Sequence, residues 1–131
     1  MSMKLNILGT KYELIVASEK DVPFLTECDG FCDTSVKKLY VKDFSQAQKD
    51  PGSLSDLGVY AHKVARHEMV HAFLYESGLS VNSDWATNEE LVDWIALQLP
   101  KLARLMVEID HAYLMSGDKS DGMETVQSQT T

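Results

Sequence analysis

Two histidines and a glutamate lie close together in the chain, as His67, Glu68 and His71. The proline-free stretch over residues 57–77 predicts a helix that ends at Gly78. Residues four apart on a helix lie about 40° apart around its axis, so both imidazoles can face one ion. Zinc held in this way lowers the pKa of a water molecule to about 7, and Glu68 can take its proton. We expect His67 and His71 to be zinc ligands and Glu68 to be the general base.

A catalytic zinc ion needs a third protein ligand, and the start of a second predicted helix offers two candidates. Glu89 and Glu90 follow His71 by 18 and 19 residues. Thr87 and Glu90 have the spacing of a capping box, which gives Glu90 a structural role and leaves Glu89 freer to bind the ion. The helix dipole alone also favours an acid here, so the choice between the two stays open. Asp93 shares a face with Glu89 and can accept the second ring N–H of a histidine ligand.

Two tyrosines of the first predicted helix are candidates for stabilising the oxyanion of a hydrolytic intermediate. Tyr75 follows His71 by four residues, and Tyr60 precedes His67 by seven, so each can reach the site. Both also fit a simpler interpretation, that of core aromatic residues with a solvated hydroxyl.

The segments before these helices indicate strands. Residues 3–17 are rich in Leu, Ile, Val and Tyr and predict two short strands or one bent strand, while residues 18–27 hold at most one helical turn. Asp29-Gly30 marks a turn, and residues 31–41 are typical of a hairpin. The sequence therefore predicts an α+β fold, in which a small antiparallel sheet precedes two main helices that carry the metal site.

The ends of the two helices are also marked in the sequence. Ser53 or Ser55 is a candidate N-cap of the first helix, and residues 80–87 form a loop between the helices. Pro100 should kink or restart the second helix, although apolar residues keep a helical spacing beyond it. We expect one domain over residues 1–115 and a flexible polar tail over residues 116–131.

Composition limits the possible partners. The 131 residues include 12 Lys and Arg against 20 Asp and Glu, which gives a formal net charge of −8, and 44% are hydrophobic. The acidic excess disfavours nucleic acid and anionic membranes as partners. No apolar run reaches membrane-spanning length, and the first residues lack the apolar segment of a signal peptide. We expect a cytoplasmic protein in which Cys28 and Cys32 are ordinary reduced thiols.

HEMVHAFLYESG followed by NEELVDWIA resembles the gluzincin arrangement, H-E-x-x-H and then E-x-x-x-D on a second helix, found in thermolysin-like peptidases. The compact layout is similar to small ImmA/IrrE-type metallopeptidase domains of phages and prophages. This resemblance implies a zincin-like fold and one zinc ion per chain, held by His67, His71 and Glu89. It implies that Glu68 is the base, that Asp93 supports a ligand, and that KKLYVK is the edge strand that pairs with an extended substrate.

The expected function is therefore zinc-dependent hydrolysis of peptide bonds in a peptide or protein substrate, by a water molecule that the metal activates and Glu68 deprotonates. The alternative is a non-catalytic zincin-fold interaction module, encoded by a phage or prophage, that binds a host or phage protein. Metal content and the response to a chelator separate these two hypotheses.

Overall fold

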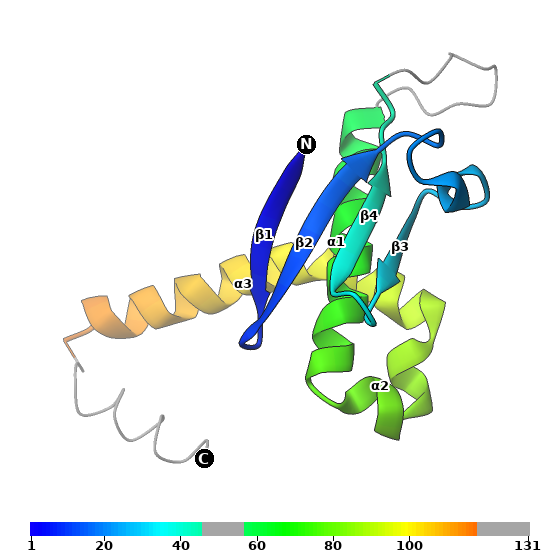
Figure 1. Cartoon of the computed structure of the whole chain (residues 1–131). Helices are drawn as coiled ribbons and strands as arrows, with labels where there is room; N and C mark the ends of the chain where they lie inside the picture. The colour runs from blue at the N-terminus through cyan, green and yellow to red at the C-terminus, as the bar shows by residue number, and fades with distance from the viewer. Residues whose placement is uncertain (46–56, 118–131) are drawn as a thin grey trace. The chain divides into compact units, whose positions relative to one another are not determined.

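The computed structural model describes residues 1–45 and 57–117, and within them the predicted α+β class is confirmed (Figure 1). The strands are β1 (Ser2–Ile7), β2 (Thr10–Ala17), β3 (Gly30–Asp33) and β4 (Lys38–Lys42). The helices are α1 (Leu57–Glu76), α2 (Leu79–Asn82) and α3 (Glu89–Met115), with 3-10 turns at Pro23–Thr26 and Asp84–Thr87. The candidate caps Ser53 and Ser55 and residues 118–131 of the predicted tail lie outside the described residues.

The chain divides into two compact units, Met1–Leu97 and Gln98–Thr131. The first unit contains the whole sheet, α1, α2 and the start of α3, and it carries every residue to which the sequence gives a chemical role. The described part of the second unit is the remainder of α3, followed by a short turn. None of the helices in the described ranges combines the length and the apolar character that a membrane crossing requires.

The sheet has the strand order β1-β2-β4-β3. β1 and β2 form a hairpin, as one of the predicted alternatives has it, and its turn uses positive φ angles at Leu8 and Gly9. β3 and β4 form the second predicted hairpin. The expectation of an antiparallel sheet is nevertheless wrong, because β2 and β4 are parallel and the sheet is mixed. Residues 18–37 supply the long connection that a parallel pair requires.

The expectation that KKLYVK is the edge strand is also wrong. KKLYVK contains β4, which lies between β2 and β3 and so has partners on both sides. The edge strand on this side of the sheet is β3. The sequence showed which segments are strands, but the hairpin can join β2 through either arm, and alternating hydrophobicity does not distinguish these arrangements.

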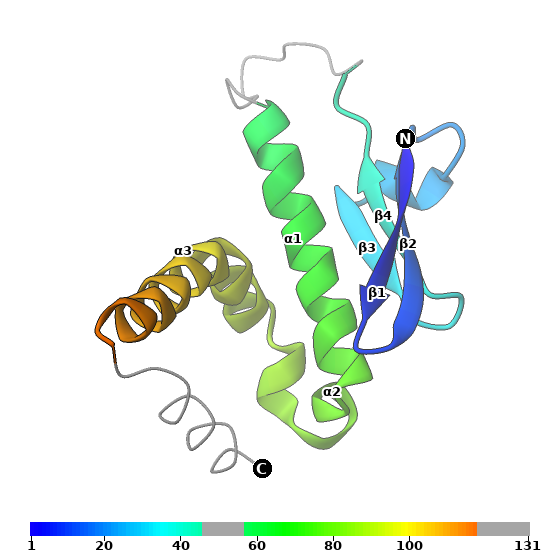
Figure 2. The same ribbon diagram turned by 90° about the vertical axis from the view of Figure 1, so that its left-hand side faces the viewer.

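α1 packs against one face of the sheet (Figure 2). Alternate residues of the strands point to that face, as the period of two requires, and their burial supplies the main stabilisation of the first unit. The core cluster consists of Ile7, Tyr12, Leu14, Leu39, Val41, Val64 and Ala72. This packing fixes the height and rotation of α1, and with them the positions of the two histidines.

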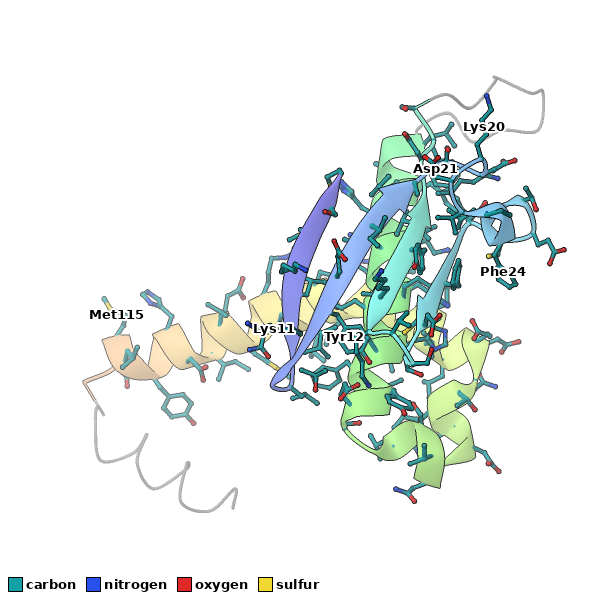
Figure 3. The ribbon with its side chains drawn as sticks, in the orientation of Figure 1. Lys11, Tyr12, Lys20, Asp21, Phe24 and Met115 are labelled. Atoms are coloured by element: carbon teal, nitrogen blue, oxygen red, sulfur yellow. The ribbon has the colours of Figure 1, made fainter. Side chains whose placement is uncertain are left out.

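The C-terminal end of α1 is anchored to the sheet through Glu76. Its carboxylate accepts hydrogen bonds from the hydroxyl of Thr10 at 2.9 Å, the hydroxyl of Tyr12 at 2.6 Å and Nζ of Lys37 at 3.0 Å. Tyr12, which Figure 3 labels near the β1–β2 turn, is 1% exposed, and its burial raises the pKa of its hydroxyl. α1 then ends as predicted, because Gly78 adopts a left-handed φ of 87°.

Three expectations about the following segment need correction. The predicted loop over residues 80–87 contains the end of the short helix α2 and a 3-10 turn. The predicted capping box is wrong, because the Asn88 side chain caps α3 by accepting the N–H of Leu91 at 2.9 Å. The Thr87 hydroxyl instead donates to the carbonyl of Asp84. The helix begins one residue later than the sequence pattern indicated, and Glu90 therefore has no partner in a capping box.

Pro100 lies inside α3, which continues through it as one helix rather than restarting. A proline lacks the N–H that would bond to the carbonyl four residues earlier, which is that of Ala96. Nε of Arg66, from α1, donates to this carbonyl oxygen at 3.3 Å. An arginine therefore satisfies the acceptor that the proline leaves open, and it ties α1 to the start of α3.

Candidate functional site

Side chains from α1 and from the first turn of α3 converge at one point of the first unit. Nε2 of His67 lies 3.1 Å from Nε2 of His71 and 2.9 Å from Oε2 of Glu89, and Nε2 of His71 lies 3.0 Å from Oε1 of Glu89. Donor atoms about 2.0–2.1 Å from a tetrahedral zinc ion lie about 3.3 Å apart. The three groups therefore have donor types, and nearly the spacing, that fit one face of a tetrahedral zinc site.

Packing between the two helices brings Glu89 to the histidines. A second core cluster joins α1 to the start of α3 and consists of Val70, Leu74, Ala86, Val92 and Ala96. Glu89 directly follows the N-cap Asn88, so its side chain projects from the first turn of α3. This side chain remains 69% exposed. Of the two acidic candidates for the third ligand, only Glu89 joins the histidine pair, and Glu90 is not part of the group.

Asp93 lies one turn after Glu89 and supports His67 from the other side of the ring. Its Oδ1 lies 3.4 Å from Nδ1 of His67, and its Oδ2 lies 3.4 Å from Nζ of Lys63. With the proton on Nδ1, His67 donates to Asp93 and presents an unprotonated Nε2 to the cluster. Lys63 in turn restrains the Asp93 carboxylate. The sequence proposed this role for Asp93 but did not identify Lys63.

His71 has the protonation state that metal binding requires. Burial lowers the pKa of its imidazole, although the nearby Glu89 carboxylate acts in the opposite direction. The neutral ring therefore predominates at neutral pH, and a neutral imidazole nitrogen is the form that coordinates a metal.

Glu68 lies directly beside the cluster and is only 7% exposed. Burial raises the pKa of its carboxyl group to about 7, while His67 acts to lower the pKa and Glu89 acts to raise it. Among the described residues no hydrogen bond or ion pair to Glu68 is formed, and Glu68 lines both of the adjacent cavities. A buried carboxyl group without a protein partner, with a pKa near neutrality, is suited to accepting and returning a proton.

Gly30 lets β3 pack closely on α1 beside Glu68, and the sequence gave it no such role. A Cβ atom at this position would lie 2.6 Å from Cγ1 of Val64 and 3.3 Å from Cγ of Glu68. The first residue of β3 therefore packs directly on α1, and no larger residue fits without a shift of the backbone. The available signal was a glycine at the start of a predicted hairpin, since strand glycines often mark a close backbone approach.

The two candidate tyrosines lie in different surroundings. Tyr60 donates its hydroxyl hydrogen to Oδ2 of Asp29, and burial together with this acceptor raises the pKa of the tyrosine to about 12. Tyr75 is 38% exposed, and Nζ of Lys37 lies 5.0 Å from the centre of its ring. Both residues line cavities that contain Glu68, but not the same cavity.

Two adjoining hollows flank the cluster, and Gly30, His67, Glu68 and Glu89 line both of them. The first, which we call the Asp29 hollow, has a volume of about 290 Å³. It is lined in addition by Asp29, Tyr60, Lys63, Val64 and Asp93. The second, the Tyr75 hollow, has a volume of about 400 Å³. It is lined in addition by Phe31, Cys32, Thr34, His71, Tyr75, Ser80 and Thr87.

One further hollow and two cysteines complete the description, although Cys32 also lines the Tyr75 hollow. A larger hollow, of about 560 Å³, lies over the β1–β2 hairpin and the start of β4, and none of the predicted site residues lines it. Cys28 and Cys32 are both free thiols.

Comparison of the chain with protein-family models, with curated proteins and with solved structures finds no match. The geometry of the site is therefore what indicates a function for this chain.

Proposed function

We propose that the chain is a zinc-dependent peptidase of zincin-like fold, in which His67, His71 and Glu89 hold one zinc ion. The observation that carries this proposal is the position of Glu68, a buried carboxyl group without a hydrogen-bond partner among the described residues, beside three groups whose donor atoms lie within 4.8 Å of one another. A structural metal site needs no such carboxyl group at its side, whereas hydrolysis needs a proton acceptor there.

Each residue has a defined task in this proposal. A zinc ion in the site would supply Lewis-acid polarisation of a peptide carbonyl and would lower the pKa of water. Glu68 would accept the proton of the attacking water and return it to the leaving amine, which its raised pKa favours. Asp93 would keep His67 in the Nδ1–H tautomer.

The edge strand β3 offers a means of holding an extended substrate. Its only strand neighbour in the described sheet is β4, so its other edge is available for main-chain hydrogen bonds. Gly30 and Phe31 of this strand line the hollows beside Glu68. A peptide that adds to β3 as a further strand would therefore pass close to the proposed base.

The test combines metal analysis with one conservative substitution. Protein purified without added zinc should contain close to one zinc ion per chain, and a chelator should remove it. Glu68→Gln should retain the zinc but lose at least about 100-fold in kcat/KM on a peptide that the wild-type protein cleaves, because the proton acceptor is gone. Glu90→Gln, which removes the same charge outside the cluster, serves as the control and should cleave normally.

Two results would contradict this mechanism. Zinc-loaded Glu68→Gln protein that cleaves at the wild-type rate would show that Glu68 is not the base. Zinc-loaded wild-type protein that cleaves no peptide would favour the second candidate function, a non-catalytic interaction module with a structural metal.

A further inference from the structure

The two hollows beside the cluster differ in the charge of the side chains that belong to each alone. Beyond Glu68 and Glu89, which line both hollows, the Asp29 hollow has two carboxylates, Asp29 and Asp93, and one cation, Lys63. The ion pair between Lys63 and Asp93, with 3.4 Å between Nζ and Oδ2, largely compensates those two charges. Of the carboxylates that belong to the Asp29 hollow alone, only that of Asp29 therefore remains uncompensated, since it forms no ion pair within the described part of the chain.

Asp29 is held in a fixed position while one of its oxygens remains available. Its carbonyl accepts the N–H of Lys42 at 2.8 Å, which fixes the backbone just before β3. The Tyr60 hydroxyl donates to Oδ2, which fixes the side chain, and Oδ1 makes no hydrogen bond to a described residue. An oriented and half-buried carboxylate of this kind can form a charge-assisted hydrogen bond to an ammonium or guanidinium group.

The Tyr75 hollow has a different lining. Outside the four residues that both hollows share, it contains no aspartate, glutamate, lysine or arginine. Two aromatic rings, Phe31 and Tyr75, and three hydroxyl residues form most of its wall. Burial raises the pKa of the Cys32 thiol to about 12, so this side chain is also neutral at physiological pH. A neutral side chain with apolar surface fits such a wall better than a charged one.

We propose that Asp29 is a specificity-determining residue, which selects peptides that place a lysine or arginine side chain in the Asp29 hollow and a neutral side chain in the Tyr75 hollow. The inference rests on the proposed peptidase function and adds a substrate class to it. The substrates are basic peptide segments in which a cationic residue and a neutral residue flank the bond that is cleaved.

The test uses short blocked Ala/Ser peptides that contain one Phe and one variable residue. The variable residue is Lys, its near-isostere Met, or Glu, placed at successive positions on either side of the Phe. Mass spectrometry locates the cut, and kcat/KM is measured for each peptide with zinc-loaded wild-type protein. The kcat/KM of the best Lys peptide should exceed that of its Met counterpart by at least about tenfold, since only Lys can form a charge-assisted hydrogen bond with Asp29.

Two variants should change this ratio in opposite directions. Asp29→Asn keeps an acceptor for Tyr60 but removes the charge, so the Lys-to-Met ratio should fall close to one. Lys63→Met removes the cation that compensates Asp93, so the ratio should rise. Asp21→Asn is the matched control, because Asp21 lies in the loop after β2 and lines neither hollow (Figure 3). A Lys-to-Met ratio that Asp29→Asn leaves unchanged would overturn the assignment.

A binding measurement separates this inference from the peptidase proposal. Fluorescein-labelled Lys, Met and Glu peptides are titrated with zinc-loaded Glu68→Gln protein, and anisotropy gives Kd without cleavage. If peptides are cleaved but the Lys peptide binds and reacts no better than the Met peptide, the inference fails while the peptidase proposal stands. If no peptide is cleaved but Asp29 still governs a preference for Lys in binding, the peptidase proposal fails and the basic-peptide specificity stands.

Discussion

Gly30 of β3 and Glu68 of α1 are in direct contact where the edge strand meets the helix. A Cβ atom on Gly30 would lie 3.3 Å from Cγ of Glu68, and it would also lie 2.6 Å from Cγ1 of Val64 and 2.8 Å from the carbonyl oxygen of Tyr40. Real Cβ atoms essentially never lie as close as 2.6 or 2.8 Å to another heavy atom. The absence of a side chain at Gly30 therefore lets β3 lie close to Val64 and Glu68 of α1. Glu68 is only 7% exposed.

Gly30→Ala is expected to lower the free energy of unfolding by about 1–3 kcal/mol, the usual cost of forcing an extra methyl group into a packed interface. Chemical denaturation of the zinc-free protein measures this effect without a contribution from metal binding. β3 must shift to accommodate the methyl group, so the proposed peptidase activity should also fall.

Val64→Ala provides the control background for this prediction. It removes the contact at 2.6 Å but leaves the one to the carbonyl oxygen of Tyr40. The cost of Gly30→Ala should therefore be smaller in the Val64→Ala protein than in the wild type. An equal cost in the two backgrounds would show that the contact with Val64 does not limit the approach of β3.

Glu89 and Glu90 provide a matched pair of variants for testing the proposed metal site, since they are adjacent, chemically identical and both at the start of α3. Only Glu89 lies within hydrogen-bond distance of both histidines. Glu89→Gln should weaken zinc binding by at least about 100-fold, because loss of a ligand costs more than the 10–100-fold typical of outer partners. Glu90→Gln should change it little. Competition with a chromophoric chelator measures both, and equal effects would contradict the assignment.

The sequence predicted the helical part of the site well because its signals are local. The spacing of His67 and His71 fixes their common face once the segment is helical, and the glycine at position 78 marks the end of that helix. The preference for Glu89 as the third candidate ligand depended on a capping box that is wrong, since Asn88 rather than Thr87 caps α3. Both capping arrangements place Glu89 in the first turn of α3, and for that reason its position beside the histidines agrees with the sequence pattern.

The contacts that the sequence did not reveal are all between segments distant in the chain. The parallel pairing of β2 with β4 depends on which arm of a hairpin enters the sheet, and both arms alternate similarly. The roles of Asp29 and Gly30 arise only after β3 becomes the edge strand over Glu68. The dipeptide Asp29-Gly30 is typical of a turn, but a glycine at the start of a strand can also mark a close approach of two backbones. The local pattern therefore indicated a turn at a position where tertiary packing requires a glycine.

The hydrogen bonds by which Glu76 ties the end of α1 to the sheet should make the stability of the fold depend on pH. Those with Tyr12 and Lys37 lower the pKa of the Glu76 carboxyl group in the folded protein below its ordinary value of 4.5. Since the unfolded chain binds this proton more readily, the anchor stabilises the fold above that value and loses its effect as pH falls through the lower folded pKa. Glu76→Gln should therefore be less stable than wild type at about pH 7, and the difference should shrink towards about pH 3.

Denaturant titrations of the zinc-free proteins at several pH values test this expectation. Glu27→Gln is the control, because Glu27 is an exposed glutamate that forms no side-chain ion pair in the described part of the chain. The free energy of unfolding of the Glu27→Gln protein should equal that of the wild-type protein at every pH. A difference between wild type and Glu76→Gln that stays constant from neutral to acidic pH would mean that the charge of Glu76 does not contribute to the anchor.

The two cysteines should react with alkylating agents at very different rates. Burial raises the pKa of Cys32 to about 12, and the nearby Glu68 carboxylate adds to the effect, so at about pH 8 only about one thiol in ten thousand is the reactive thiolate. Cys28 is less enclosed, although burial raises its pKa as well. Iodoacetamide should modify Cys28 well before Cys32 in the folded protein, as peptide mass spectrometry can follow. In denaturant the two alkylation rates should become similar, because the difference comes from the fold and not from the thiols. Similar rates in the folded protein would contradict the burial of the Cys32 thiol in the wall of the Tyr75 hollow.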